Sequence, residues 1–358
     1  MATYCAVCQI IYRVGTMGTI IYDNLNKNNK KIYDLMKKSF LAFSPTVYLG
    51  AGISGDKVQN IMYSVLADNP DIIYFDKTEI AVGFDFLKGN YIKLRKFYKP
   101  LEAKRRVSQM LEKTKRIIEE IEQMYPDSDY ERMLFAYSYL QSHFTYDQEE
   151  FEYSCITGNS IRPDSHNAFG VLINGTGVCD GFASAFSLIM KNFYISSSSI
   201  SGKASFNTTV PSNHQWNIVK FGNQFFHCDV TWDLDDYRSF KEYSYKYFCV
   251  DDLCIKKTHI WDYRSYPQCT SSNMAYFIKK GLLVHSWEQF DRLVGIIAKS
   301  KKSFFQILLS EHMTFENSLK ESEFLAKRIQ NITLKYRNSV SFNYKWDPDI
   351  RCLSCRYN

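Results

Sequence analysis

The sequence contains no apolar run long enough to cross a membrane, no internal repeat and no low-complexity tract. A transmembrane helix needs about 20 consecutive apolar residues, so the first absence predicts a chain without a membrane span. The apolar share of 45% and the charged share of 23% are ordinary for folded proteins, and they exclude disordered, collagen-like and coiled-coil chains. The length of 358 residues predicts two or three domains that fold without stabilising cross-links.

The N-terminus also lacks the basic start and the long apolar core of a secretory signal peptide. Its one apolar run, over residues 5–12, is short and stops at Arg13. The ten cysteines are too few for a disulfide-built scaffold of this length, and they favour a reducing compartment with mostly buried thiols. We therefore expect a cytoplasmic protein, and a secreted one only if the chain is a processed fragment.

Neither sign of charge dominates, since 44 Lys and Arg residues stand against 38 Asp and Glu residues, a net charge of +6. The two densest basic stretches, residues 93–99 and 104–116, are interleaved with leucine, glutamate and aromatic residues. This mixture favours a solvated helix face over a nucleic-acid or membrane patch, so we expect no nucleic-acid partner. The 26 tyrosines and 26 phenylalanines belong mostly to the core in this interpretation.

Hydrophobic periodicity and turn residues divide the chain into three regions, with boundaries near residues 100 and 267. Residues 1–100 are predicted to form an α/β accessory region. Its predicted elements are helices over 24–43 and 54–66, strands over 71–75 and 79–86, and a turn at Asp76 and Lys77.

The second region, residues 101–267, combines helices with a hairpin. The predicted helices cover 101–124, 130–143 and a segment beginning at Cys179, and a polar loop covers 158–165. Strands over 215–220 and 224–230 are joined by Gly222-Asn223, a strong hairpin signal. Residues 268–358 are predicted to form a small α/β unit, with helices over 287–298 and 316–329 and strands over 304–309, 332–336, 340–344 and 350–357.

The residues that carry chemistry begin in segment 175–183, where glycines precede a cysteine that opens a helix. At that position the helix dipole lowers a thiol pKa and favours the nucleophilic thiolate. His214 starts the first strand of the hairpin, and Asp229 is expected on the second strand. Side chains on paired strands can lie side by side, so the carboxylate can orient the imidazole while the imidazole activates the thiol. Each of the three residues alone would suit a structural role, but together they predict a Cys–His–Asp site.

These motifs resemble those of bacterial members of the transglutaminase-like superfamily. The matching segments are Gly177-Val178-Cys179-Asp180-Gly181-Phe182-Ala183, His214-Gln215-Trp216-Asn217 and Asp229-Val230-Thr231-Trp232-Asp233. Weaker similarity at 144–147, 245–248, 257–259 and 266–267 extends the resemblance over residues 127–267. The resemblance implies an α+β fold with a papain-like transglutaminase core, in which the nucleophile helix packs on an antiparallel sheet. It places this catalytic core in residues 101–267, between the two accessory regions.

The resemblance also implies roles for single residues. Cys179 would be the nucleophile, His214 the general base and acid, and Asp229 the residue that orients His214. The backbone N–H of Cys179 would form part of the oxyanion hole. The resemblance does not identify the second hydrogen-bond donor of the oxyanion hole. Four cleft residues are candidates: Tyr146, Gln148, His166 and Asn167. Trp216 and Trp232 would shield the site.

Three further groups carry weaker signals. His227 lies two residues before Asp229, so strand alternation puts both on one face and makes His227 a cleft candidate. Two CxxC pairs, Cys5 with Cys8 and Cys352 with Cys355, could close a zinc site if the termini meet, but strand-like neighbours favour buried thiols. The cluster of Asp233, Asp235 and Asp236 favours a solvated loop over a calcium site. We therefore expect no metal or cofactor.

The predicted reaction is acyl transfer through a thioester. The Cys179 thiolate attacks a carbonyl of a peptide or side-chain amide, and His214 protonates the departing amine. Water as acceptor gives a peptidase or amidase, which we favour, whereas a lysine amine gives a cross-link. The expected partner is a peptide or protein substrate, with a cell-wall peptide as one option. The alternative is a catalytically silent papain-like module that binds a protein or a cell-wall peptide.

Overall fold

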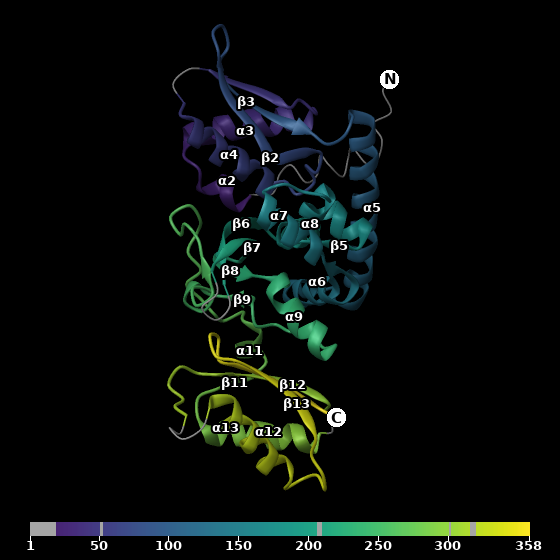
Figure 1. Ribbon diagram of the computed structural model, residues 1–358, viewed down its shortest axis with the longest axis vertical. Coiled ribbons are helices and arrows are strands. Elements are labelled where there is room, and N and C mark those ends of the chain that lie inside the picture. The colour runs from purple at the N-terminus through teal and green to yellow at the C-terminus, as the bar shows by residue number, and fades with distance from the viewer. Residues whose placement is uncertain (1–18, 51–52, 206–209, 301, 316–319) are drawn as a thin grey trace.

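The computed structural model describes residues 19–50, 53–205, 210–300, 302–315 and 320–358. The three regions of the chain follow one another along the long axis of the molecule, from the purple N-terminal helices to the yellow C-terminal unit (Figure 1). Residues 5–12, with Cys5 and Cys8, lie outside the described residues. In the described part of the chain, no helix is both long and apolar enough to cross a membrane.

The middle region is built on a five-stranded antiparallel sheet with the order β10-β6-β7-β8-β9. The strands are β6 (Ser197–Ala204), β7 (Ser212–Phe221), β8 (Gln224–Cys228), β9 (Phe248–Val250) and β10 (His259–Ile260). The predicted hairpin between β7 and β8 is confirmed. Its turn holds Gly222 at φ 60°, in the left-handed region that glycine enters without steric cost.

The helix α8 (Cys179–Asn192) packs against strands β6 and β7. Phe182, Phe186 and Ile189 recur at helical spacing and are buried, so one apolar face of α8 forms the core. The Asn217 side chain donates a hydrogen bond of 2.9 Å to the Ala183 carbonyl and ties the sheet to the helix. This helix on an antiparallel sheet is the α+β core predicted from the sequence.

Two long helices, α5 (Pro100–Met124) and α6 (Asp129–His143), pack against α8 and confirm the predicted helices. The Ser128 hydroxyl accepts a hydrogen bond from the Glu131 N–H and caps α6. Two of the longer helices of this region were not predicted, α7 (Gln148–Thr157) and α9 (Val230–Phe240). The shorter elements are β4 (Thr145–Tyr146), η2 (Pro163–His166), η3 (Gly170–Asn174), β5 (Thr176–Gly177), α10 (Asp252–Ile255) and α11 (Tyr276–Lys279).

In the N-terminal region two helices pack beside a sheet of order β1-β3-β2, and a third, short helix over residues 20–24 packs on β6 and β7 of the middle sheet. These elements are α2 (Ile20–Asn24), α3 (Lys27–Leu41), β1 (Thr46–Gly50), α4 (Gly55–Asp68), β2 (Phe75–Asp85) and β3 (Gly89–Lys96). The predicted turn at Asp76 and Lys77 is wrong, because β2 is one strand with a bulge between Asp76 and Ile80. Asp76 is held in the sheet by an ion pair of 2.8 Å with Arg95 on β3.

Apolar side chains of the N-terminal region join the same hydrophobic core as α5, α6 and α8. The core is therefore continuous across residue 100, where α5 begins. The region boundaries expected from the sequence stay predictions.

The C-terminal unit has its own apolar core and a four-stranded sheet of order β11-β12-β14-β13. Its elements are β11 (Leu283–Val284), α12 (Trp287–Lys299), β12 (Phe304–Leu309), α13 (Glu321–Thr333), β13 (Phe342–Asp347) and β14 (Cys352–Tyr357). The predicted strand over 332–336 is wrong, because α13 continues to Thr333. The buried Thr333 hydroxyl shares a hydrogen bond of 2.8 Å with the Tyr357 hydroxyl, which anchors the end of this helix to β14.

A buried polar contact joins α9 to the C-terminal sheet. Asp233 and Asp236, predicted to lie in a solvated loop, are both fully buried on α9. Asp236 accepts a hydrogen bond of 2.9 Å from Lys345 and forms an ion pair of 3.3 Å with the buried Lys246. Burial of these carboxylates is tolerated because each is paired or hydrogen-bonded. Through these polar contacts the C-terminal unit binds α9, the helix that begins next to Asp229.

Candidate active site

Cys179, which carries the thiol of the site, occupies the first position of α8. Val178, just before it, is extended, and its N–H donates a hydrogen bond of 2.9 Å to the Ser165 carbonyl. A Cβ atom at Gly181 would lie 2.3 Å from that same carbonyl oxygen, so only glycine fits there. The glycine on the C-terminal side of Cys179 therefore lets η2 pack directly against the start of the helix. Cys179 itself is partly exposed.

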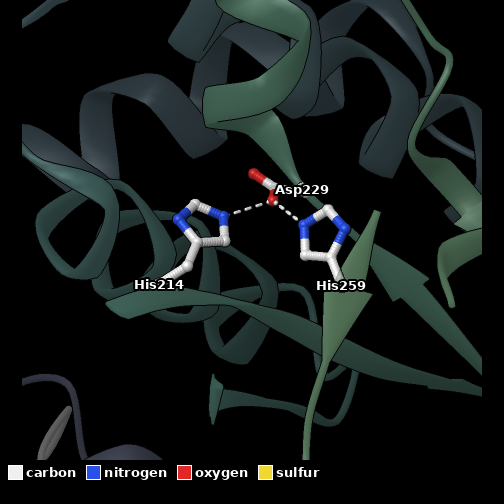
Figure 2. A group of neighbouring side chains, drawn as sticks. All are labelled: His214, Asp229 and His259. Carbon is white, nitrogen blue, oxygen red and sulfur yellow. Dashed lines mark hydrogen bonds and ion pairs between the residues drawn. The ribbon is translucent and has the colours of Figure 1, made fainter. Parts of the chain in front are cut away.

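His214 and Asp229 form a short hydrogen bond on the sheet. His214 Nε2 lies 2.6 Å from Asp229 Oδ2, and both side chains are buried (Figure 2). The Cys179 thiol lies close enough to His214 to raise the pKa of the imidazole. Because Nε2 is engaged by Asp229, the other ring nitrogen, Nδ1, is the one left for the sulfur. The structure thus brings the three predicted residues into one line of contacts.

Asp229 is not on a strand, contrary to the sequence-based expectation. β8 ends at Cys228, and Asp229 caps the N-terminus of α9. Its Oδ1 accepts hydrogen bonds from the backbone N–H groups of Thr231 at 3.0 Å and Trp232 at 3.2 Å. An aspartate is a preferred helix cap, since it accepts from unpaired amides and favours the positive end of the dipole. The cap fixes the carboxylate while its Oδ2 faces His214.

The charges at the site follow from this geometry. Burial lowers the pKa of His214, but the adjacent Asp229 carboxylate and the Cys179 thiol outweigh it and raise this pKa to about 10. Burial likewise raises the pKa of Asp229, but His214 and a second histidine, His259, hold it well below its usual range. At neutral pH the pair is therefore an imidazolium beside a carboxylate.

His259 is the residue at this site to which the sequence assigned no role. It lies on β10, and its Nε2 is 3.0 Å from Asp229 Oδ2 (Figure 2). The segment 257–259 belongs to the resemblance, but a strand of two residues gives no periodic signal that would predict its position. Among the described residues, His214, Asp229 and His259 also form one of two groups able to hold a metal ion. Their nitrogen–oxygen separations of 2.6 and 3.0 Å are those of ordinary hydrogen bonds.

Of the four candidates for the second oxyanion donor, Tyr146 on β4 lies near the backbone N–H of Cys179. Burial and then the neighbouring Cys179 and Asp180 groups raise the pKa of Tyr146 far above its ordinary value, so the phenol keeps its proton. Gln148 donates its amide to Glu152 at 2.9 Å.

The other two candidates, His166 and Asn167, line a separate cavity of about 220 Å³. His166 Nε2 and Nδ1 contact Glu150 at 2.9 Å and Asp180 at 3.1 Å. Burial lowers the pKa of His166, but the Asp180 and Glu150 carboxylates raise it to about 9. Lys77 on the β2 bulge completes the cluster with an ion pair of 2.9 Å to Asp180. His166 is therefore part of a charged support for the residue next to Cys179.

A cleft of about 310 Å³ opens beside His214. Its walls come from β4 and α7, from β6 and β7, and from α9, and they include Tyr146, Gln148, Phe151 and Trp232. Asp235 and Arg238 line it from exposed positions on α9. Trp232 thus lines the cleft, and its shielding role stays a prediction.

Trp216 and His227 lie deeper than predicted. The Trp216 ring stacks on His214 with centroids 5.8 Å apart, and its indole N–H donates a hydrogen bond of 3.0 Å to His227. His227 is fully buried and bonds Asp252 through its other nitrogen at 2.9 Å. The prediction that His227 lines the cleft is wrong, because Trp216 lies between it and His214.

The zinc hypothesis fails for Cys352 and Cys355. Both are buried on β14, three residues apart, so strand alternation turns them to opposite faces. Their side chains join two different apolar clusters. The other pair, Cys5 and Cys8, lies outside the described residues.

The site thus consists of a thiol at the start of a helix that packs on an antiparallel sheet, an imidazole on that sheet, and the carboxylate of a helix cap beside the imidazole. The sequence profile of the transglutaminase-like superfamily matches residues 112–230, which hold Cys179, His214 and Asp229. The family resemblance predicted from the motifs is thereby confirmed for this segment, about a third of the chain. None of the curated proteins matches the sequence.

Two solved structures are similar to parts of the chain. One is a crystal structure of a TGase, with 14% identity over 52% of this chain and 50% of that one, at a TM-score of 0.31. The other is a proposed cysteine protease from Cytophaga hutchinsonii, with 11% identity over 43% of this chain and 61% of that one, at a TM-score of 0.25. The chain thus spans half to three fifths of these relatives, and such TM-scores are too low to define a shared fold.

Proposed function

We propose that the protein is a cysteine-dependent acyl-transfer enzyme that hydrolyses peptide or side-chain amides. The observation that carries the proposal is the line of contacts from the Cys179 thiol through His214 to Asp229 at 2.6 Å, beside an open cleft. A protonated imidazole next to a sulfur stabilises the thiolate, which is the nucleophilic form.

The reaction would run in two halves. In the first, the Cys179 sulfur bonds to the carbonyl carbon, the C–N bond breaks, and the proton on His214 passes to the departing amine. A thioester remains on Cys179. In the second, His214 takes a proton from water, whose oxygen attacks the thioester carbon, and the sulfur leaves as thiolate. The acid is released and His214 is again protonated.

Water is the acceptor that we favour. Cys179 is itself partly exposed, so water can reach a thioester on its sulfur. To test this, the protein is incubated with a peptide mixture, including glutamine-containing and cell-wall-type peptides, in the presence of a fluorescent primary amine. Mass spectrometry should find hydrolysis products in excess of amine adducts. Adducts in excess would make the protein a cross-linking enzyme, and neither product would favour a silent binding module.

Tyr146 is proposed to stabilise the oxyanion together with the Cys179 N–H. Replacing Tyr146 by phenylalanine keeps the ring and removes the hydroxyl, so kcat should fall about 100-fold with little change in KM. Steady-state kinetics on the best peptide substrate measures this. The matched control is Tyr153→Phe, at an exposed position on α7. An unchanged kcat in Tyr146→Phe would exclude this role for the phenol.

A further inference from the structure

We propose that His259 is a positioning residue, which holds the Asp229 carboxylate in the orientation that serves His214. The inference rests on the proposed function of Cys179 and His214. His259 lies 45 residues beyond His214, on β10, which pairs with β6 through His259 and Ala204. Figure 2 shows the two imidazoles approaching the same oxygen of Asp229 from opposite sides.

The hydrogen bonds of Asp229 show what His259 adds. Oδ1 is fixed by the two amides at the start of α9 and by the Thr231 hydroxyl at 2.7 Å. Oδ2 accepts from His214 Nε2 at 2.6 Å and from His259 Nε2 at 3.0 Å. The second torsion of an aspartate side chain is soft, so donors at Oδ1 alone leave the plane of the carboxylate free to tilt about that oxygen. With His259 in place, both oxygens are held independently of His214. His214 can then move its proton to a leaving group and back without losing its acceptor.

His259 can act in this way because it is neutral. Burial lowers its pKa to about 4, which outweighs the opposing effect of Asp229. A neutral imidazole donates through Nε2 and accepts at Nδ1, and the Thr258 hydroxyl lies 2.8 Å from Nδ1. A charged His259 would oppose the protonation of His214, whereas a neutral one supplies only a hydrogen bond.

The surroundings keep the ring in place. Trp232, Trp216 and Tyr247 pack around it with ring centroids at 4.4, 4.8 and 5.6 Å. The titratable groups that face His259 are Asp229, His214, His227 and Tyr247. Of these, Asp229 is the group that hydrogen-bonds to it. The rings exclude water from Oδ2, so a lost donor would not be replaced by solvent without repacking.

The test compares His259→Phe, which fills the space without a donor, with His259→Gln, whose amide can donate from nearly the same position. The first readout is the rate of iodoacetamide labelling of Cys179 at pH 6.5, which needs no substrate. The second is kcat and KM on a peptide substrate. His259→Phe should slow labelling and kcat about tenfold with KM unchanged, and His259→Gln should stay within about threefold of the wild type. His285→Phe, at an exposed position in the C-terminal unit, is the control.

Several outcomes would overturn the proposal. Labelling and kcat within twofold of the wild type in His259→Phe would do so, and so would an equal loss in both variants, because packing and not donation would then matter. If His259→Phe does not fold, Thr258→Val decides, since removing the hydroxyl frees the imidazole to change tautomer and should slow labelling. An unchanged rate in Thr258→Val would contradict the proposal. A wild type that labels fast but turns over no peptide would instead refute the proposed function alone.

Discussion

Replacing Cys179 by alanine is expected to reduce peptide turnover to the background of the buffer, a loss of about 10⁴-fold or more. The reaction proposed here has no step that proceeds without the sulfur, because the thioester is its intermediate. Cys179 is partly exposed at the first position of α8 and does not belong to the apolar core, so the melting temperature should not change. Kinetics and circular dichroism on the same preparation measure both quantities.

Two controls make this result specific. Cys179→Ser keeps the size of the side chain but offers a far weaker nucleophile, so its turnover should also be at background. Cys155→Ala removes the exposed thiol on α7 and should leave turnover unchanged. Retained turnover in Cys179→Ala would refute the proposed mechanism. Peptide that binds equally to the wild type and to Cys179→Ala without being turned over by either would favour a binding module.

The sequence predicted those parts of the site that are encoded locally. The glycines around Cys179 are required by the close approach of the Ser165 carbonyl, so they leave a motif in the chain itself. The turn at Gly222 brings β7 beside β8, which places His214 near Asp229. The long helices α5 and α6 were predictable because apolar spacing and caps act within one element.

The parts that depend on contacts between distant segments were missed. His259 reaches Asp229 through a strand of two residues, whose position is set by pairing with β6 and not by any pattern of its own. The bulge of β2 replaced a predicted turn because Arg95, on another strand, pairs with Asp76. The alternation of β8 predicts a strand that includes Asp229, whereas the unpaired amides at the start of α9 make this residue a helix cap. Tertiary partners decided each of these cases.

Removing the imidazole of His214 is expected to change how the reactivity of Cys179 depends on pH. In the wild type, the pKa of His214 is raised to about 10 by Asp229 and the Cys179 thiol, so the imidazolium persists through neutral pH. Its positive charge favours the thiolate, and iodoacetamide labelling should change little between pH 6.5 and 9. In His214→Ala this positive charge is absent, and labelling at pH 6.5 should be about 10- to 100-fold slower. Peptide mass spectrometry of Cys179 gives the rates.

Because folding raises the pKa of His214, the free energy of unfolding should also depend on pH. This dependence provides an independent control. The pKa of His214 is higher in the folded protein, at about 10, than in the unfolded chain, at about 6.5. The folded state therefore binds the extra proton between these values, so this part of the free energy of unfolding is complete below pH 6.5 and is lost as the pH rises to 10. Wild type should lose stability over that window relative to His214→Ala in denaturant titrations. If both proteins label slowly, with the pH dependence of a free thiol, His214 does not activate Cys179, and the cleft is then a binding site whose thiol is idle.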